Sequence, residues 1–258
     1  MKLKDRVVLI TGGNRGIGRT AALALAVEGA DLVLLGLDEE GLHRVADEVR
    51  TGGRRCLTYR ADVSREEDVQ RAVEQALDHF GRIDVLVNNA AIMGPTAPVV
   101  NVALAEWQET LAVNLTGPFL CCRAVLPQMI ARRSGKIINI SSIGGRRAYP
   151  LRAPYAVSKA GLLMLTRTLA AEVGEYNIQV NAICPGPVAG ERMRHVIEMR
   201  ARQTGLSIEE TTRQFVERTA LRRMVEERDV AALILFLASD DGNNITGAIF
   251  DVTAGYGL

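Results

Sequence analysis

Tyr155 and Lys159 stand four residues apart, a spacing that places two side chains on one face of a helix, about one turn from each other. A phenol alone ionises at about pH 10 and is a poor base at neutral pH. A neighbouring ammonium group stabilises the phenolate, so this pair has the chemistry of a proton donor and acceptor. The same spacing also fits an ordinary surface pair on an amphipathic helix.

A second set of residues has the chemistry to hold a phosphate. Residues 11–18 read TGGNRGIG, between a β-branched apolar run and an alanine-rich helical run. Glycines at such a place let the backbone turn tightly and let a pyrophosphate approach the N-terminus of the helix. Turns also use glycine for conformation alone, and the spacing differs from plain GxGxxG. The place between the first strand and the first helix favours dinucleotide binding.

The elements that position these residues follow from periodicity, because short β-branched runs alternate with longer helical stretches. Strands are predicted over 6–11, 31–37, 55–60, 83–88, 136–141, 178–184 and 248–252, and helices over 20–28, 39–50, 66–80, 106–131, 154–173 and 227–238. Ser64 is the predicted cap of the third helix, and Gly81 its stop. The pattern predicts an α/β fold of the Rossmann-type doubly wound kind, with a seven-stranded, mostly parallel sheet flanked by helices. We expect a single domain over 1–258, with an irregular substrate lid at about 187–224.

Composition argues against several other classes. The chain has 31 basic and 30 acidic residues, for a formal net charge of +1, so no global field favours nucleic acid or an anionic membrane. The four cysteines lack CxxC spacing and a nearby histidine cluster, so neither a metal site nor a disulfide is expected. The N-terminal apolar run is too short for a signal peptide, and no apolar stretch approaches bilayer length. We expect a cytoplasmic protein.

These features together resemble the short-chain dehydrogenase/reductase family, near its 3-oxoacyl reductases, and the resemblance runs along essentially the whole chain. TGGNRGIG matches the family's cofactor loop, Asp62-Val63 its adenine-contacting pair, and Asn88-Asn89-Ala90 its fourth-strand motif. Asn114, Ser142, which stands thirteen residues before Tyr155, and Pro185-Gly186 match further positions. The cofactor contacts implied by the resemblance are Gly12, Asn14, Arg15, Gly16, Ile17, Gly18, Asp62, Val63, Asn89, Ala90, Tyr155, Lys159, Pro185, Gly186 and Val188.

The resemblance also implies a mechanism. Ser142 would hydrogen-bond the substrate carbonyl, a nicotinamide would give a hydride to its carbon, and Tyr155 would protonate the alkoxide. Lys159 would bind the nicotinamide ribose, and Asn114 would anchor a water that passes the proton onward. The same residues serve oxidation, so the reaction is either carbonyl reduction, such as that of a 3-oxoacyl thioester, or oxidation of a small secondary alcohol, polyol or dihydrodiol. A catalytically silent dinucleotide sensor is the alternative outside enzymes.

The family resemblance implies a homotetramer as well, with helices 106–131 and 154–173 pairing across two-fold axes. Two departures from the family pattern stand out. Ala91 replaces the usual glycine after Asn-Asn-Ala, and Gly190 replaces a threonine that bonds the carboxamide. How this chain holds the carboxamide is therefore an open question.

The choice of nicotinamide cofactor depends on residues around the second strand. Gly36 stands where NAD users carry an aspartate for the ribose 2′-hydroxyl, and Arg15 has the charge to meet a 2′-phosphate. NADP(H) is therefore favoured. NAD(H) is the alternative, because Asp38 lies close enough along the chain to reach the ribose.

Arginines are unusually dense near the expected substrate site. Three lie between Ser142 and Tyr155, and four more lie in the lid: Arg146, Arg147, Arg152, Arg192, Arg194, Arg200 and Arg202. This density indicates an anionic carbonyl or alcohol substrate, with Arg147 or Arg152 as its partner. The alternative is that these side chains face solvent or pair with acids at a subunit interface.

Overall fold

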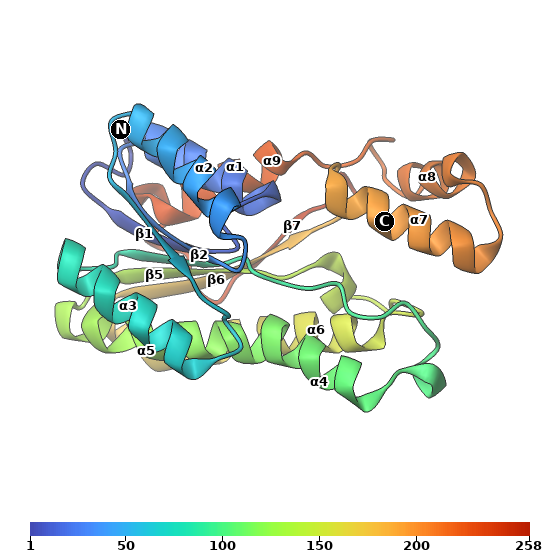
Figure 1. The fold of residues 1–258 in the computed structure, drawn as a ribbon, viewed down its shortest axis with the longest axis horizontal. Coiled ribbons are helices and arrows are strands. Elements are labelled where there is room, and N and C mark those ends of the chain that lie inside the picture. Colours follow the sequence, from blue (N-terminus) through green and yellow to red (C-terminus); the bar gives the residue numbers. More distant parts are fainter.

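Seven strands form one sheet through the centre of the protein, whose computed structural model describes residues 1–258 (Figure 1). They are β1 (Val7–Thr11), β2 (Asp31–Gly36), β3 (Cys56–Arg60), β4 (Val85–Asn88), β5 (Gly135–Ile140), β6 (Ile178–Pro185) and β7 (Ile249–Val252). Their order is β3-β2-β1-β4-β5-β6-β7, and every neighbouring pair is parallel. The sheet is therefore wholly parallel, where the sequence predicted a mostly parallel one.

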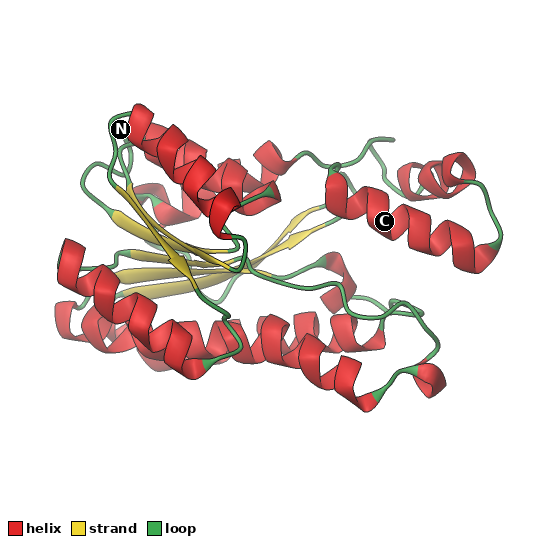
Figure 2. Ribbon diagram, viewed as in Figure 1, coloured by secondary structure: helices red, strands yellow, loops and turns green.

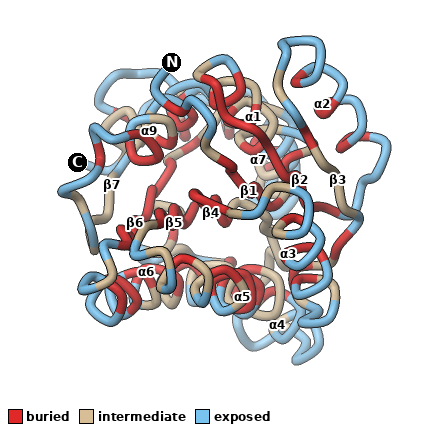
Figure 3. The backbone as a smooth tube through the Cα atoms, turned by 90° about the vertical axis from the view of Figure 1, so that its left-hand side faces the viewer, coloured by how far each residue is buried: buried red, intermediate tan, exposed pale blue.

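Helices cover both faces of the sheet, as a parallel sheet requires (Figure 2). One face carries α1 (Gly16–Val27), α2 (Glu39–Thr51) and α9 (Glu227–Ala238), and the other carries α3 (Glu66–Phe80), α5 (Gly117–Arg132) and α6 (Ala153–Val173). Figure 3 looks along the sheet and shows the buried strands between these two helical layers. Short 3₁₀ turns are η1 (Val99–Asn101), η3 (Ile143–Gly145), η4 (Gly174–Tyr176) and η5 (Asp240–Gly242).

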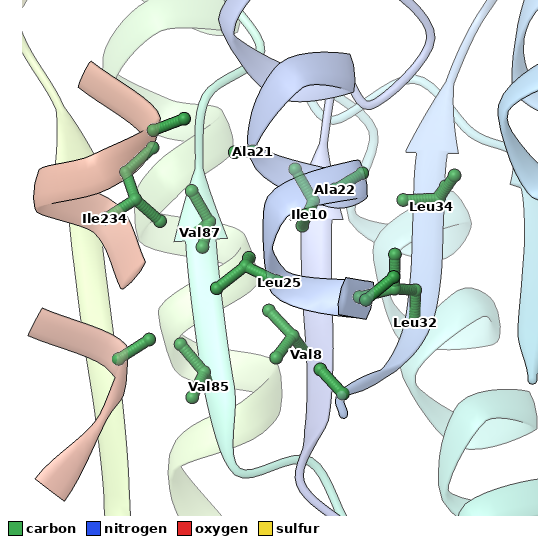
Figure 4. Packing of buried hydrophobic residues seen from close by; sticks show 14 of the residues in the cluster. Val8, Ile10, Ala21, Ala22, Leu25, Leu32, Leu34, Val85, Val87 and Ile234 are labelled. Carbon is green, nitrogen blue, oxygen red and sulfur yellow. The ribbon is translucent and has the colours of Figure 1, made fainter. Parts of the chain in front are cut away.

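The core has two parts because successive side chains of a strand point to opposite faces. Val8 and Ile10 of β1 pack with Leu25 of α1 and Ile234 of α9 on one face (Figure 4). Leu9, between them in the chain, belongs to the cluster on the other face. All five residues of β1 are buried, so the apolar run that predicted this strand is the run that the helices cover.

Strand order reverses direction between β1 and β4. The chain moves outward from β1 to β2 and β3, then returns to place β4 on the other side of β1. At such a switch point the loops after the two strands leave in opposite directions and open a crevice at the carboxyl edge of the sheet. The TGGNRGIG loop follows β1 and therefore lies at this crevice.

The helical run after β4 differs from the prediction of one regular helix. It comprises α4 (Leu104–Leu111), a π-helical turn η2 (Ala112–Thr116) and α5. The π-helical turn ends with the Gly117 N–H bonded to the Ala112 carbonyl, directly before Pro118, which has no N–H to donate to the Asn114 carbonyl. The prediction of Ser64 as a helix cap is also wrong, because α3 is preceded by Arg65, and the Ser64 hydroxyl donates to Asp62 instead.

Residues 187–224 are more regular than predicted. They contain α7 (Glu191–Thr204) and α8 (Ile208–Glu217), which Figure 1 shows beyond the carboxyl edge of the sheet. Ser207 caps α8 by accepting a hydrogen bond from the Glu210 N–H, and the Glu210 carboxylate accepts from the Ser207 N–H in return. Gly205 separates the helices with φ of 72°. The two helices correct the expectation of an irregular segment.

The run Leu104–Arg132 is long and apolar enough to cross a membrane, with a mean hydropathy of 1.2 over its most apolar window. This contradicts the expectation that no stretch approaches that length. Half of the window is buried inside the protein. Core helices of globular proteins meet the same criterion, so the finding is weak support for a membrane span.

Candidate active site

The glycine loop between β1 and α1 has backbone positions that side chains would block. Gly12 and Gly16 have φ of 66° and 58°, in the left-handed region that glycine favours. A methyl group on Gly18 would overlap the Gly12 carbonyl oxygen and lie 2.6 Å from the amide nitrogen of Asn89. At Gly16, by contrast, it would meet only a Glu227 carboxylate oxygen, at 3.7 Å. The loop is therefore packed against the protein at Gly18 and open at Gly16.

Helix α1 begins at this open position. No side chain caps its first N–H groups, and its first turn carries no acidic residue. Such a helix start is suited to an anion, because unpaired N–H groups and the helix dipole both favour negative charge. Ile17 packs against the core. The exposed Arg15 lies 3.5 Å from Glu191 of α7. These features fit the pyrophosphate of a dinucleotide.

The end of β4 braces the glycine loop. The Asn89 side chain donates to the carbonyls of Thr11 and Gly12 at 3.0 and 3.1 Å. The Thr11 hydroxyl accepts from the N–H groups of Asn89 and Ala90, each at 3.0 Å. The fourth-strand motif thus fixes the loop after the neighbouring strand.

Two carboxylates lie at the ends of β2 and β3. Asp38 caps α2 through the Gly41 N–H and accepts from the Asn14 side chain at 3.1 Å. These two hydrogen bonds lower the pKa of Asp38. Asp62 accepts from the N–H and the hydroxyl of Ser64, at 2.9 and 2.7 Å. The adjoining Val63 is buried.

The Tyr155 and Lys159 pair lies on α6, as the spacing predicted. The Lys159 ammonium is 5.9 Å from the centre of the Tyr155 ring and donates to the Ile140 carbonyl at 2.8 Å. Lys159 is 3% exposed. Burial, and then the charge of Arg192, lower the pKa of Lys159 to about 7. A surface pair on an amphipathic helix is therefore ruled out for this lysine.

Ser142 and Ser141 point in different directions after β5. The Ser141 hydroxyl is buried and donates to the Lys159 carbonyl at 2.8 Å. Ser142 is only partly buried, and its hydroxyl accepts from the Gly144 N–H at 3.1 Å. A methyl group on Gly145 would lie 2.6 Å from the Lys159 carbonyl carbon. This close approach holds the Ser142 turn against the helix of Tyr155 and Lys159.

Asn114 lies in the π-helical turn and is fully buried. Its amide donates to the Ile92 carbonyl at 3.0 Å and to the Ser158 hydroxyl at 3.2 Å, and its oxygen accepts from the Ile92 N–H at 2.8 Å. Ser158 in turn donates to the Tyr155 carbonyl at 2.8 Å. Asn114 therefore links the loop after β4 to the helix of Tyr155.

The turn after β6 sits against β7. Gly186 donates to the Val252 carbonyl at 2.9 Å, and Val188 pairs with Val225 in a parallel bridge. Gly190 has φ of 147°, and a methyl group there would lie 3.1 Å from the Glu227 carboxylate. The backbone at Gly190 is thus unsuited to the threonine that the family usually has there.

The arginines separate into distinct environments. Arg146 pairs with Asp251 at 2.7 Å, and Arg147 donates to the Gly257 carbonyl. Arg152 is 5% exposed and lies beside the Tyr155 ring. Sequence reasoning did not foresee this burial, and the only signal was the position of Arg152 three residues before Tyr155.

Comparison with known proteins agrees with this architecture. A family model described as enoyl-(acyl carrier protein) reductase matches residues 12–257. The chain is 36% identical over 255 residues to a 3-oxoacyl-[acyl-carrier-protein] reductase of Thermotoga maritima, covering 99% of each chain. It is 36% identical over 262 residues to a (2S)-[(R)-hydroxy(phenyl)methyl]succinyl-CoA dehydrogenase subunit of Thauera aromatica, covering 100% of this chain and 99% of the other. A crystal structure of NAD⁺-bound xylitol dehydrogenase superposes with a TM-score of 0.96 at 33% identity, covering 99% of this chain and 100% of that one.

The parallel sheet, the glycine loop at its switch point and these matches define a class of Rossmann-fold oxidoreductases. The chain belongs to the short-chain dehydrogenase/reductase family. It is an oxidoreductase that interconverts a carbonyl group and a secondary alcohol with a nicotinamide dinucleotide.

Proposed function

We propose that Tyr155 is the group that gives a proton to the substrate oxygen in reduction and takes it back in oxidation. Ser142 binds the same oxygen, and Lys159 provides positive charge that stabilises the phenolate. The observation that carries this proposal is the burial of the Lys159 ammonium 5.9 Å from the Tyr155 ring. A bound nicotinamide supplies or accepts the hydride.

Asn114 serves the proton relay through its main chain in this proposal. Both hydrogens of its side-chain amide are donated, one to Ile92 and one to Ser158. Its carbonyl has no donor four residues ahead, because that position is Pro118. The carbonyl is therefore the group that binds a water, which carries the proton between Lys159 and solvent.

The dinucleotide is held along the carboxyl edge of the sheet. Its pyrophosphate would bind at the open face of Gly16 and the uncapped start of α1. Asp62 and Val63 would contact the adenine. Pro185, Gly186 and Val188 would contact the nicotinamide at the turn after β6. Tyr155 and Lys159 complete the contacts on the ribose side.

We favour NADP(H) because the exposed Arg15 is free to leave its 3.5 Å contact with Glu191 for a 2′-phosphate. One observation favours NAD(H) instead. The Asp38 carboxylate is held next to the glycine loop by Asn14, and its charge would repel a phosphate and bind a ribose diol. Arg15→Ala should weaken NADP(H) about tenfold or more and NAD(H) little. Asp38→Asn should weaken NAD(H) if the alternative holds.

The substrate proposal is reduction of a 3-oxoacyl thioester, supported by the 3-oxoacyl reductase from Thermotoga maritima. Oxidation of a small alcohol or polyol is the second candidate, supported by the likeness to xylitol dehydrogenase. The anionic substrate expected from the arginines stays a prediction. The Thauera aromatica relative supports it, because its name specifies a succinyl-CoA compound.

We also propose that residues 1–258 act as one domain, with the α7–α8 segment as the substrate lid, in a homotetramer. Apolar side chains on α5 and α6 support the tetramer, since Phe119 and Met164 are 43% and 60% exposed. Leu163, which precedes Met164 on α6, packs in the protein's own core instead. The cytoplasmic location stays a prediction.

A turnover screen tests the function. Ketones, 3-oxoacyl thioesters, secondary alcohols and polyols are each offered with NADP(H) and with NAD(H), and absorbance at the nicotinamide band reports the reaction. The Tyr155→Phe protein is the matched control, because it should bind cofactor and leave every substrate unchanged. Activity of Tyr155→Phe near that of the wild type would reject the assigned roles.

A further inference from the structure

Arg152 is a buried cation at the edge of the candidate active site. It is 5% exposed and immediately precedes α6. Its guanidinium donates to the Met93 carbonyl at 2.7 Å and to the Thr96 hydroxyl at 3.1 Å. The central carbon of the group lies 5.3 Å from the centre of the Tyr155 ring. Its Nε is buried and has no hydrogen-bond partner.

Positive charge around Tyr155 is not balanced by any neighbouring acid. Arg152, Lys159 and Arg192 lie 5.3, 5.9 and 5.9 Å from the centre of the ring. None of the three forms an ion pair with a carboxylate of this chain. Buried charges are ordinarily paired, because an isolated ion in a poorly solvated place is costly. Arg152 and Lys159 are buried, whereas Arg192 is exposed and needs no partner. The two buried charges are therefore suited either to an anion from outside the chain or to stabilising the Tyr155 phenolate.

Other arginines of this region do not share the feature. Arg146 already has Asp251 at 2.7 Å, and Arg147 donates to the Gly257 carbonyl. In α7, Arg200 lies 5.6 Å from the Phe215 ring. Only Arg192 of that helix approaches Tyr155. The structure thus separates Arg152 and Arg192 from the set that the sequence could not divide.

We propose that Arg152, assisted by Arg192, binds an acidic group of the substrate. The N–H groups of Arg152 that do not bond to Met93 and Thr96 would donate to a carboxylate, as arginine does in charge-assisted pairs. This inference rests on the proposed function, since it assumes that Tyr155 handles the substrate oxygen.

The geometry also says where in the substrate the acid lies. The guanidinium and the Tyr155 ring are neighbours, with 5.3 Å from carbon to ring centre. A single small molecule that contacts both must carry its carboxylate only a few bonds from the reacting carbon. Within the proposed reaction, the substrate is therefore an oxo acid or hydroxy acid: either a short one, or an acyl thioester that carries an additional acid near the reacting carbon. A charge at the far end of a long acyl carrier would not satisfy Arg152.

The test compares an acid with its neutral ester. Acetoacetate and methyl acetoacetate have the same reacting ketone, and only the first is anionic. We expect the wild type to prefer the acid at least tenfold in kcat/KM. Arg152→Gln keeps a neutral hydrogen-bond donor at this position but removes the charge, and should reduce that preference about 10- to 100-fold, the range expected for a charge-assisted hydrogen bond. Arg152→Lys should retain part of it.

Arg194→Gln is the matched control, because Arg194 is an exposed residue of the same helix as Arg192. This variant should leave the preference for the acid unchanged. The idea is overturned if the wild type shows no preference, or if Arg152→Gln lowers acid and ester equally. The second result would mean that Arg152 only positions the loop or supports the phenolate.

A measurement without turnover keeps this inference separate from the proposed function. Butanoate should raise the unfolding temperature of the cofactor-loaded wild type, whereas butanamide should not. The effect should vanish in Arg152→Gln and persist in Arg194→Gln. No effect of butanoate on the wild type overturns the anion site. Failure of every carbonyl and alcohol in the screen instead overturns the function, whatever butanoate does.

Discussion

Replacing Lys159 by methionine should stabilise the protein and abolish turnover. The amine is 3% exposed, and the pKa of Lys159 is lowered from 10.5 to about 7, first by burial and then by Arg192. The unfolded chain therefore holds this proton more tightly than the folded one does. Below pH 7 the buried charge destabilises the folded state in full, and this penalty fades as the pH rises toward 10.5.

The magnitude follows from the same values. A pKa lowered from 10.5 to about 7 corresponds to roughly 4–5 kcal/mol at about 1.4 kcal/mol per pKa unit. Methionine also loses the hydrogen bond to the Ile140 carbonyl, which offsets about 1–3 kcal/mol. We expect a net gain of about 1–4 kcal/mol in the free energy of unfolding at pH 6, shrinking steadily toward pH 10.

Urea unfolding of the cofactor-free protein at pH 6, 8 and 9.5 measures this gain. Lys136 offers a control away from the site, since it is 8% exposed and donates to the Ser239 carbonyl at 2.8 Å. Burial lowers the pKa of Lys136 to about 8. Lys136→Met should therefore gain stability at pH 6 and keep its activity. The reasoning would be refuted if Lys159→Met were less stable than the wild type at pH 6, or if its gain in the free energy of unfolding did not change with pH.

Three further outcomes are expected. Tyr155→Phe should lose nearly all turnover while cofactor affinity, measured by nicotinamide fluorescence, stays within a few-fold, because only the proton-transfer group is removed. Gly18→Ala should lower stability by about 1–3 kcal/mol in thermal unfolding and weaken cofactor binding in a titration, since its methyl group overlaps the Gly12 carbonyl. Gly174→Ala is the control and should change neither quantity, because no atom lies within 4 Å of the added methyl group. Gly190→Thr should destabilise the protein by about 1–3 kcal/mol without improving cofactor affinity, because φ of 147° strains any side chain; tighter binding by this variant would show that the family's threonine contact can be restored.

The fold was predictable because its signals are local and repeated. β1 reads VVLIT and is buried at all five positions, so its composition alone identifies a strand covered on both faces. Gly81, predicted as the end of α3, has φ of 73° and ends that helix. Strand ends still moved by a residue or two, because the hydrogen bonds of a neighbouring strand decide where a strand stops.

Other features depended on signals that act against the main pattern. A π-helical turn directly before Pro118 interrupts the long apolar run, where periodicity predicted a regular helix. Periodicity does not predict α7, which is rich in charge, or α8, although Ser207 and Glu210 form a recognisable capping box before α8. The spacing of Tyr155 and Lys159 predicted their shared helix face, but only packing showed that Lys159 is buried.

Substrate recognition was the least predictable part of the site for a physical reason. Arg146, Arg147 and Arg152 are the same residue type within seven positions, so sequence alone gives them equal standing. The folded chain supplies a carboxylate to the first and a carbonyl to the second, both from segments about a hundred residues away. Arg152 receives a carbonyl, a hydroxyl and two tyrosine rings but no carboxylate, so its charge has no ionic partner beside Tyr155. The function of each arginine therefore depends on whether the folded chain gives it a carboxylate partner, and tertiary contacts decide this.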